Sequence, residues 1–278
     1  MIAIISLDRV RPRERRVAAG FFDGIHIGHR STIKGCDTVL TFDPHPRAVV
    51  GTAVAPKHLS TLAHRAEILE SLGVRELVVI DFNKSRSRQT PDAFTQEVFV
   101  DALRATHVHV GASFRFGFKA AGTPESLAAD GRFAVRVART VSVDGEVVSS
   151  TRIRELIERG DVSRAASLLG SFPEVVATIA PGERCQATTR TAVRLSTSSC
   201  LPVPGRYGCV VNGVAGVLTI PEAERLVGGA TIDHPVSLPA GALIRIQLTS
   251  GSGVSQRPAP PVVLPAEFCH GPGRQSCS

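Results

Sequence analysis

Tryptophan is absent from the 278-residue chain, and aromatic residues make up only 5% of it. Any core must therefore consist mostly of valine, alanine, leucine and isoleucine. No apolar run approaches the roughly 18 residues that a membrane-spanning helix needs, and residues 2–7 are too short for a signal segment. These absences predict a cytoplasmic protein with no membrane partner.

None of the six cysteines stands in a CxxC pair. A structural zinc site is therefore not expected, and no metal-binding residues are predicted. In the cytoplasm, free thiols are the ordinary state of scattered cysteines.

The chain is basic, with a net charge of +7. Residues 1–170 carry 24 basic and 19 acidic residues, residues 171–278 carry 8 and 6, and arginines cluster at positions 9–16. A positive balance suits either a polyphosphate or a nucleic acid. No RNP, zinc-finger or coiled-coil pattern is present, so an anionic small molecule is the expected partner and nucleic acid is not.

Strand and helix patterns alternate over the first 170 residues. Strands are predicted at residues 17–20, 38–42, 77–80, 108–110 and 133–137. Helices are predicted at 62–72 and from Pro91 to about Ala105, and a hairpin turn at Asp144-Gly145. The alternation predicts an α/β fold in which a parallel sheet has helices on both faces.

The pattern changes after Gly170. Short apolar runs split by glycine and proline predict a small all-β domain at about residues 175–250. From Gly251 the chain is rich in glycine, proline and serine, which is typical of disorder. We therefore expect domains at 1–170 and 171–250, with a disordered tail at 251–278.

The strongest chemical signal is the block GFFDGIHIGH, residues 20–29, directly after a predicted strand. His26 and His29 stand three positions apart at a helix start, so both imidazoles share one face. There they can donate hydrogen bonds to triphosphate oxygens. Gly24 and Gly28 leave room where a nucleotide and the backbone approach closely. The alternative is a turn with two solvated histidines.

A second signal is SSTRIR, residues 149–154, at the start of a helix. Ser150 or Thr151 is expected to cap this helix, with Arg154 one turn further in. Hydroxyls, free amides and a guanidinium together bind phosphate well. The alternative is an ordinary cap with surface arginines.

Two further blocks follow predicted strands. TFDPHPR, residues 41–47, places His45 in a loop fixed by prolines, and VGASFRFGF, residues 110–118, has three phenylalanines in five positions. The first is either a rigid turn or a site loop. The second is either a surface for a flat ring or a core cluster.

Together the four blocks resemble the N-terminal domain of bacterial bifunctional riboflavin kinase/FMN adenylyltransferases, also called FAD synthetases. The family pattern G-x-F-D-G-x-H-x-G-H, T-F-x-P-H-P, V-G-x-x-F-R-F-G and S-S-T-x-x-R occurs in that order over roughly residues 15–170. The resemblance implies a Rossmann-like nucleotidyltransferase domain of the HIGH superfamily, followed by a β-barrel-like domain.

The resemblance also implies a reaction: FMN attacks the α-phosphorus of ATP to give FAD and diphosphate, with Mg²⁺ on the phosphates. The implied catalytic residues are His26, His29 and Arg154. The implied ATP-binding residues are Gly20, Phe21, Asp23, Gly28, Ser150 and Thr151. The implied flavin-binding residues are Phe42, His45, Phe114, Arg115 and Phe116.

Two departures from the family pattern stand out. Only residues 30–40 separate the HIGH block from the next strand, which leaves room for about two helical turns. The G-x-P-T-A-N loop of the kinase domain is replaced by QATTRTAV, residues 186–193, without proline or asparagine. We therefore expect FMN adenylyltransferase activity without riboflavin kinase activity, and a barrel that keeps a flavin-binding or packing role.

Two other functions remain open: transfer to another phosphorylated acceptor, and a catalytically weak paralogue that binds flavin or nucleotide as a regulator. An aminoacyl-tRNA synthetase is disfavoured because no KMSKS segment is present. A homo-oligomer is also left open.

Overall fold

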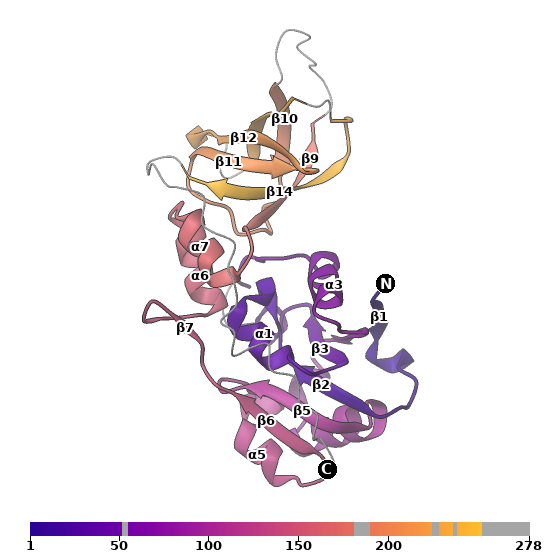
Figure 1. Cartoon of the computed structure of the whole chain (residues 1–278). Helices are drawn as coiled ribbons and strands as arrows, with labels where there is room; N and C mark the ends of the chain where they lie inside the picture. The colour runs from indigo at the N-terminus through magenta and orange to yellow at the C-terminus, as the bar shows by residue number, and fades with distance from the viewer. Residues whose placement is uncertain (52–54, 181–189, 224–227, 236–237, 252–278) are drawn as a thin grey trace, which may run out of the picture.

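The computed structural model describes residues 1–51, 55–180, 190–223, 228–235 and 238–251. An α/β region built on a twisted sheet lies at one end and a β-barrel at the other, with helices α6 and α7 between them (Figure 1). The predicted fold class is confirmed. The predicted tail lies outside the described residues, apart from Gly251.

The sheet has six strands in the order β1-β4-β3-β2-β5-β6, and every neighbouring pair is parallel. The strands are β1 (Ala3–Ser6), β2 (Arg15–Ala19), β3 (Thr38–Asp43), β4 (Glu76–Asp81), β5 (Ala105–Gly111) and β6 (Ala134–Ala138). Strands β3 and β4 are added on one side of β2, and β5 and β6 on the other, so the strand order reverses at β2. Such a switch opens a crevice at the carboxyl ends of the strands.

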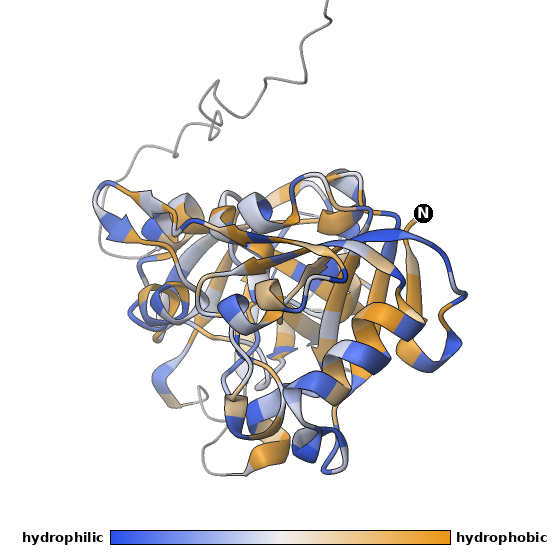
Figure 2. Cartoon of the chain, turned by 90° about the horizontal axis from the view of Figure 1, so that it is seen from below, coloured by the Kyte–Doolittle hydropathy of each residue, from blue (hydrophilic) through white to orange (hydrophobic). Residues whose placement is uncertain are grey.

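Helices pack on both faces of the sheet. They are α1 (Ile27–Ile33), α2 (Pro46–Val50), α3 (Leu62–Ser71), α4 (Pro91–Phe94) with η4 (Thr95–Ala102), and α5 (Pro124–Ala129). Alternate strand residues feed two cores: Val17 packs with Phe99 and Leu127 on one face, whereas Ala18 packs with Ile33 and Leu69 on the other. The apolar strands lie between these layers (Figure 2).

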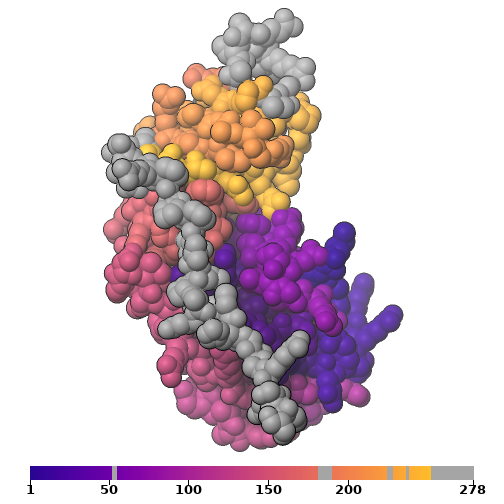
Figure 3. Space-filling view, in the orientation of Figure 1, coloured from indigo at the N-terminus to yellow at the C-terminus, as the bar shows by residue number. Residues whose placement is uncertain are grey.

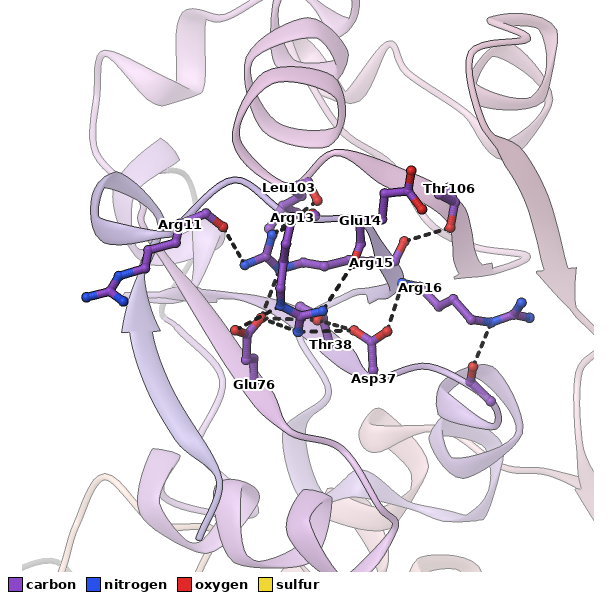
Figure 4. Close-up of polar contacts among 11 residues, drawn as sticks. Arg11, Arg13, Glu14, Arg15, Arg16, Asp37, Thr38, Glu76, Leu103 and Thr106 are labelled. Carbon is purple, nitrogen blue, oxygen red and sulfur yellow. Dashed lines mark hydrogen bonds and ion pairs between the residues drawn. The ribbon is translucent and has the colours of Figure 1, made fainter.

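Arg15, at the start of β2, is a buried cation at the edge of the sheet opposite the crevice. Its Nε donates to Glu76 Oε2 at 2.8 Å, and its other nitrogens donate to the carbonyls of Arg11, Arg13 and Leu103 (Figure 4). The arginine cluster of the sequence is therefore partly a structural network that ties together the first residues of β2 and β4. It does not face the crevice.

Helices α6 (Ser150–Glu158) and α7 (Val162–Leu169) form a hairpin after the short ribbon of β7 (Ser142–Val143) and β8 (Glu146–Val147). The predicted turn at Asp144-Gly145 joins the two strands of this ribbon, and both turn residues have positive φ. Ile153 and Leu168 of the hairpin pack against Leu59 and Cys200. The hairpin thus contacts both the α/β region and the C-terminal region.

The C-terminal region is a closed antiparallel barrel in the order β10-β13-β12-β11-β14-β9. Its strands are β9 (Glu174–Ile179), β10 (Arg190–Leu195), β11 (Gly205–Val211), β12 (Val214–Ile220), β13 (Gly229–Asp233) and β14 (Leu243–Ser250). Its interior is apolar and includes the fully buried Tyr207 and Leu248. The prediction of a small all-β domain is confirmed.

Among the residues that the structure describes, no helix is long and apolar enough to cross a membrane. Cys36, Cys200 and Cys209 are buried free thiols, as expected. The other cysteines lie outside the described ranges.

Candidate nucleotide site

The GFFDGIHIGH block leaves the carboxyl end of β2, at the crevice between β3 and β5. Its backbone is unusual, because Phe22, Gly24 and Ile25 all have positive φ. At Gly24, with φ of +78°, a Cβ would meet Leu169 and Leu59 at 3.1 Å, so any other residue would be strained there. Left-handed residues other than glycine store strain that the surrounding structure must hold. This strained turn precedes α1 and places His26 and His29 at the start of that helix.

His26 and His29 stack on each other, with ring centroids 3.5 Å apart. His26 caps α1, because its Nδ1 accepts a hydrogen bond from the His29 amide at 3.2 Å. The Nε2 of a neutral His26 is therefore its N–H donor. His29 Nδ1 is buried and has no hydrogen-bond partner among the described residues. A partner from a bound ligand would satisfy it.

Both imidazoles are neutral near pH 7. Burial lowers the pKa of His26 to about 4. Burial holds the pKa of His29 well below its ordinary value, and the cations Arg65 and Arg154 lower it further. The pair therefore presents two neutral rings, each with one N–H donor.

The low pKa values predict acid sensitivity in the ligand-free protein. The unfolded chain takes up a proton on His26 near pH 6.5, whereas the folded chain takes it up near pH 4. Stability is therefore lost as the pH falls through this window, by about 2 kcal/mol from His26 alone at pH 5. Urea unfolding at pH 7 and pH 5 measures the difference. We expect ATP to reduce it, since phosphate charge raises both pKa values; equal stability at the two pH values would contradict the burial of these rings.

Asp23 connects three segments around the loop. Its side chain is buried, and its carboxylate accepts the amides of Leu59 and Ser60 at 3.0–3.1 Å and Arg154 Nη2 at 2.6 Å. In this arrangement Asp23 holds the loop, and its carboxylate is already occupied. The predicted ATP-binding role of this residue stays a prediction.

The SSTRIR block lies against the histidine loop. Ser150 Oγ donates to the carbonyl of Asp23 at 3.1 Å, and Arg154 Nε donates to the carbonyl of Lys57 at 2.6 Å. The predicted helix cap was wrong by one or two positions: Ser149, not Ser150 or Thr151, caps α6 by accepting the Arg152 amide. Thr151 is exposed. The two sequence blocks that were expected to surround one triphosphate are therefore neighbours.

Arg65 is a cation that the sequence analysis missed. It is buried in α3, its Nη1 donates to the carbonyl of Phe21 at 2.9 Å, and its guanidinium lies 5.1 Å from the Phe21 ring centre. Its Nε has no partner among the described residues. The available signal was its place on the buried stripe of α3, with Ala66 and Leu69.

The glycines of the block fit closely beside rings. A Cβ on Gly28 would lie 3.3 Å from the His26 ring, and one on Gly20 would lie 3.0 Å from the Phe22 ring. Phe21 is half-buried and contacts the His45 ring at 4.2 Å, edge to face. Gly20, Phe21 and Gly28 are therefore packed within the histidine loop itself.

His45 follows β3 and caps α2, because its Nδ1 accepts the Arg47 amide at 3.0 Å. Burial lowers the pKa of His45 to about 4, so it too presents a neutral ring. Together with its contact to Phe21, this places the TFDPHPR loop at the same edge of the sheet as His26 and His29.

The phenylalanines divide between core and surface. Phe42 and Phe116 are buried and pack against Phe94, whereas Phe114 is partly buried and stacks on Phe116 with ring centres 5.5 Å apart. Arg115 is exposed, and its Nη1 donates to the carbonyl of Phe114. Phe114 and Arg115 are therefore more exposed than the two core rings.

The described part of the chain holds no group of three or more His, Cys, Asp or Glu side chains that suits a metal ion. The carboxylate nearest the histidines, Asp23, is engaged by Arg154 and two amides.

Comparison with known proteins identifies the family of the chain. Residues 8–152 match the family model described as FAD synthetase. The chain is 34% identical over 227 residues to the bifunctional riboflavin kinase/FMN adenylyltransferase of Listeria monocytogenes, covering 75% of this chain and 72% of that protein. It is 30% identical over 226 residues to the Bacillus subtilis protein of the same name, covering 72% and 71%.

A solved structure also shares the fold. A crystal structure described as a macrolide-efflux protein from Streptococcus pneumoniae superposes with a TM-score of 0.80 over 92% of this chain and 93% of that chain, at 21% identity. At that identity the likeness concerns the fold alone. On the family match and the two sequence relatives, the chain belongs to the bacterial riboflavin kinase/FMN adenylyltransferase (FAD synthetase) family.

Proposed function

We propose that this protein is an FMN adenylyltransferase that converts ATP and FMN to FAD and diphosphate. The observation that carries the proposal is the convergence of His26, His29, Ser150 and Arg154 at the carboxyl end of β2, where Ser150 and Arg154 both bond to Asp23 of the histidine loop. Membership of the FAD synthetase family supports the same reaction.

In the proposed reaction an oxygen of the FMN phosphate attacks the α-phosphorus of ATP. One P–O bond forms, the bond between the α-phosphorus and the bridging oxygen breaks, and diphosphate leaves with the electron pair. The neutral N–H groups of His26 and His29 donate to phosphate oxygens as charge builds up on them. Arg154 and Arg65 supply positive charge nearby, and both lower the pKa of the His29 ring.

Mg²⁺ neutralises phosphate charge when it arrives with ATP. The Asp23 carboxylate, which bonds to Arg154 and to two amides, is not free to hold it. The residues of the chain then bind and orient the two substrates, and no covalent intermediate is required.

The flavin pocket is proposed at Phe114 and Arg115, with Phe42, Phe116 and His45 around it. Phe114 offers a partly exposed ring for stacking, and Arg115 offers an exposed cation for the FMN phosphate. The buried rings of Phe42 and Phe116 support Phe114 from the core side.

We propose in addition that the protein lacks riboflavin kinase activity. The QATTRTAV segment has neither the proline nor the asparagine of the family's kinase loop. Residues 186–189 of this segment lie outside the described ranges, and the rest begins β10. The sequence departure is therefore the support for this part of the proposal.

The test incubates the purified protein with ATP and Mg²⁺ and with either FMN or riboflavin, and separates the flavins by chromatography. We expect FAD from FMN, and neither FMN nor FAD from riboflavin. A folded sample that forms no FAD from FMN contradicts the proposed transferase activity. FMN formed from riboflavin contradicts the proposed lack of riboflavin kinase activity. Other phosphomonoesters in place of FMN serve as the acceptor control.

A further inference from the structure

The turn at residues 196–200, between β10 and β11, links the barrel to the segment that holds the histidine loop. His58 donates its amide to the carbonyl of Ser198 at 2.8 Å, and Cys200 donates its amide to the carbonyl of His58 at 2.8 Å. His58 and Ser199 thus form a parallel bridge, a piece of β-ladder between the barrel and the α/β region.

The next residues along this ladder hold Asp23. The amides of Leu59 and Ser60 donate to the Asp23 carboxylate, and Ser60 Oγ accepts the Gly24 amide at 2.9 Å. Asp23 in turn pairs with Arg154 at 2.6 Å. A continuous line of hydrogen bonds therefore runs from the barrel turn to the guanidinium beside the histidines.

The interface around this ladder is incompletely packed. A cavity of about 100 Å³ lies beside it, lined by residues of both regions that include His58, Ser60, His64, Ser198 and Glu174. Other polar links across the interface include the pairs His64–Glu174 at 3.0 Å and Arg245–Glu67 at 2.6 Å. At the turn itself, Lys57 Nζ donates to the Thr197 carbonyl and Cys200 Sγ donates to the Arg154 carbonyl at 3.7 Å. Figure 3 shows α3 and the last barrel strand side by side at this interface. On the other side of the ladder Leu59 packs into the core of the α6–α7 hairpin, and the ladder bonds fix the backbone between this core and the cavity.

We propose that the barrel acts as a positioning element for adenylyl transfer: its 196–200 turn fixes residues 57–60, and these fix Asp23 and orient Arg154. The kinetic part of this inference rests on the proposed function. It gives the barrel a task that needs neither kinase chemistry nor flavin binding.

The experiment compares Cys200→Pro with Cys200→Ala in the full-length protein. Proline removes the amide that donates to His58, whereas alanine keeps it. We expect FAD formation by the proline variant to be about tenfold slower than by the alanine variant, since tenfold matches the net effect of one hydrogen bond. The loss should lie in kcat, with the KM for FMN unchanged. A barrel that bound flavin would instead raise the KM for FMN with kcat intact, and that result would overturn the proposal.

Hydrogen–deuterium exchange provides a readout independent of activity. In Cys200→Pro we expect faster exchange at residues 57–61 and 20–29, with β3 and the barrel strands protected as in Cys200→Ala. Faster exchange in every barrel strand would mean that the variant has lost its barrel, and the same comparison then uses His58→Pro and His58→Ala. If hydrogen–deuterium exchange becomes faster only at residues 196–200, the positioning role of the barrel is contradicted. This outcome can be read even if the wild-type protein forms no FAD and the proposed transferase activity has failed.

A second variant tests the route. If the barrel acts through Arg154, then in an Arg154→Gln background the change Cys200→Pro should slow FAD formation less than twofold further. Independent action would multiply the two effects, and a full tenfold loss in that background would contradict the route through Asp23 and Arg154.

Discussion

Replacing His29 by alanine is expected to lower kcat/KM for FAD formation by about 10²–10³-fold, the range found when one preorganised donor to a developing oxyanion is lost. The imidazole is neutral and packs between the His26 ring and Phe22, and its Nδ1 has no partner among the described residues. A ligand oxygen is the natural partner for such a ring. Initial rates with ATP and FMN, together with a thermal melt, check the prediction.

Two further variants separate this role from simple packing. His29→Asn keeps a donor of smaller size and should recover part of the lost rate. His107→Ala removes a half-buried histidine on β5 whose Nδ1 contacts its neighbour Thr106, and it should leave the rate within about twofold. A His29→Ala protein that forms FAD at nearly the wild-type rate would contradict the catalytic assignment.

The central strands of the sheet could be predicted because each is a short apolar run buried on both faces. Strand β1 was missed: residues 2–7 were considered only as a possible signal segment, although Ala3–Ser6 pairs with β4 at the sheet edge. This edge strand is mostly exposed, so burial leaves little pattern in its sequence.

The helix expected from Pro91 to about Ala105 was only partly right. It starts at Pro91 as predicted and then widens into a π-helix from Thr95 to Ala102. It stops before Arg104, which has a φ of +46° and leads into β5. Glycine is the usual residue at such a left-handed helix end, so an arginine there gives no stop signal.

At the site, the sequence predicted which blocks would meet but not how they are joined. The short interval between residues 30 and 40 fits the observed seven-residue α1. The Asp23 carboxylate that binds Arg154 is held by the amides of Leu59 and Ser60. These two residues belong to no motif, so the sequence did not indicate the link. Arg65 lies on the buried stripe of α3 beside Ala66, but that position indicates burial and not the Phe21 carbonyl that its guanidinium binds.

Replacing Asp23 by alanine is expected to destabilise the protein by about 3–5 kcal/mol, the usual cost of removing one partner of a buried ion pair. The side chain of Asp23 is 1% exposed and that of Arg154 is 14% exposed, so water does little to replace the lost contacts. The change leaves the Arg154 guanidinium without its carboxylate and the amides of Leu59 and Ser60 without an acceptor. The slope and midpoint of urea unfolding give the free energy.

The matched control is the surface pair of Asp233 and Arg190, which are 31% and 60% exposed at 3.3 Å. Asp233→Ala should cost less than about 1 kcal/mol, as exposed ion pairs do. If Asp23→Ala cost no more than this control, the Asp23 carboxylate would not hold the loop. The strained residues Phe22 and Ile25 would then need another anchor, since their left-handed backbone persists only where the surroundings fix it. A large loss of stability in Asp23→Ala that Arg154→Gln reproduces only in part would instead place most of the anchoring in the amides of residues 59 and 60.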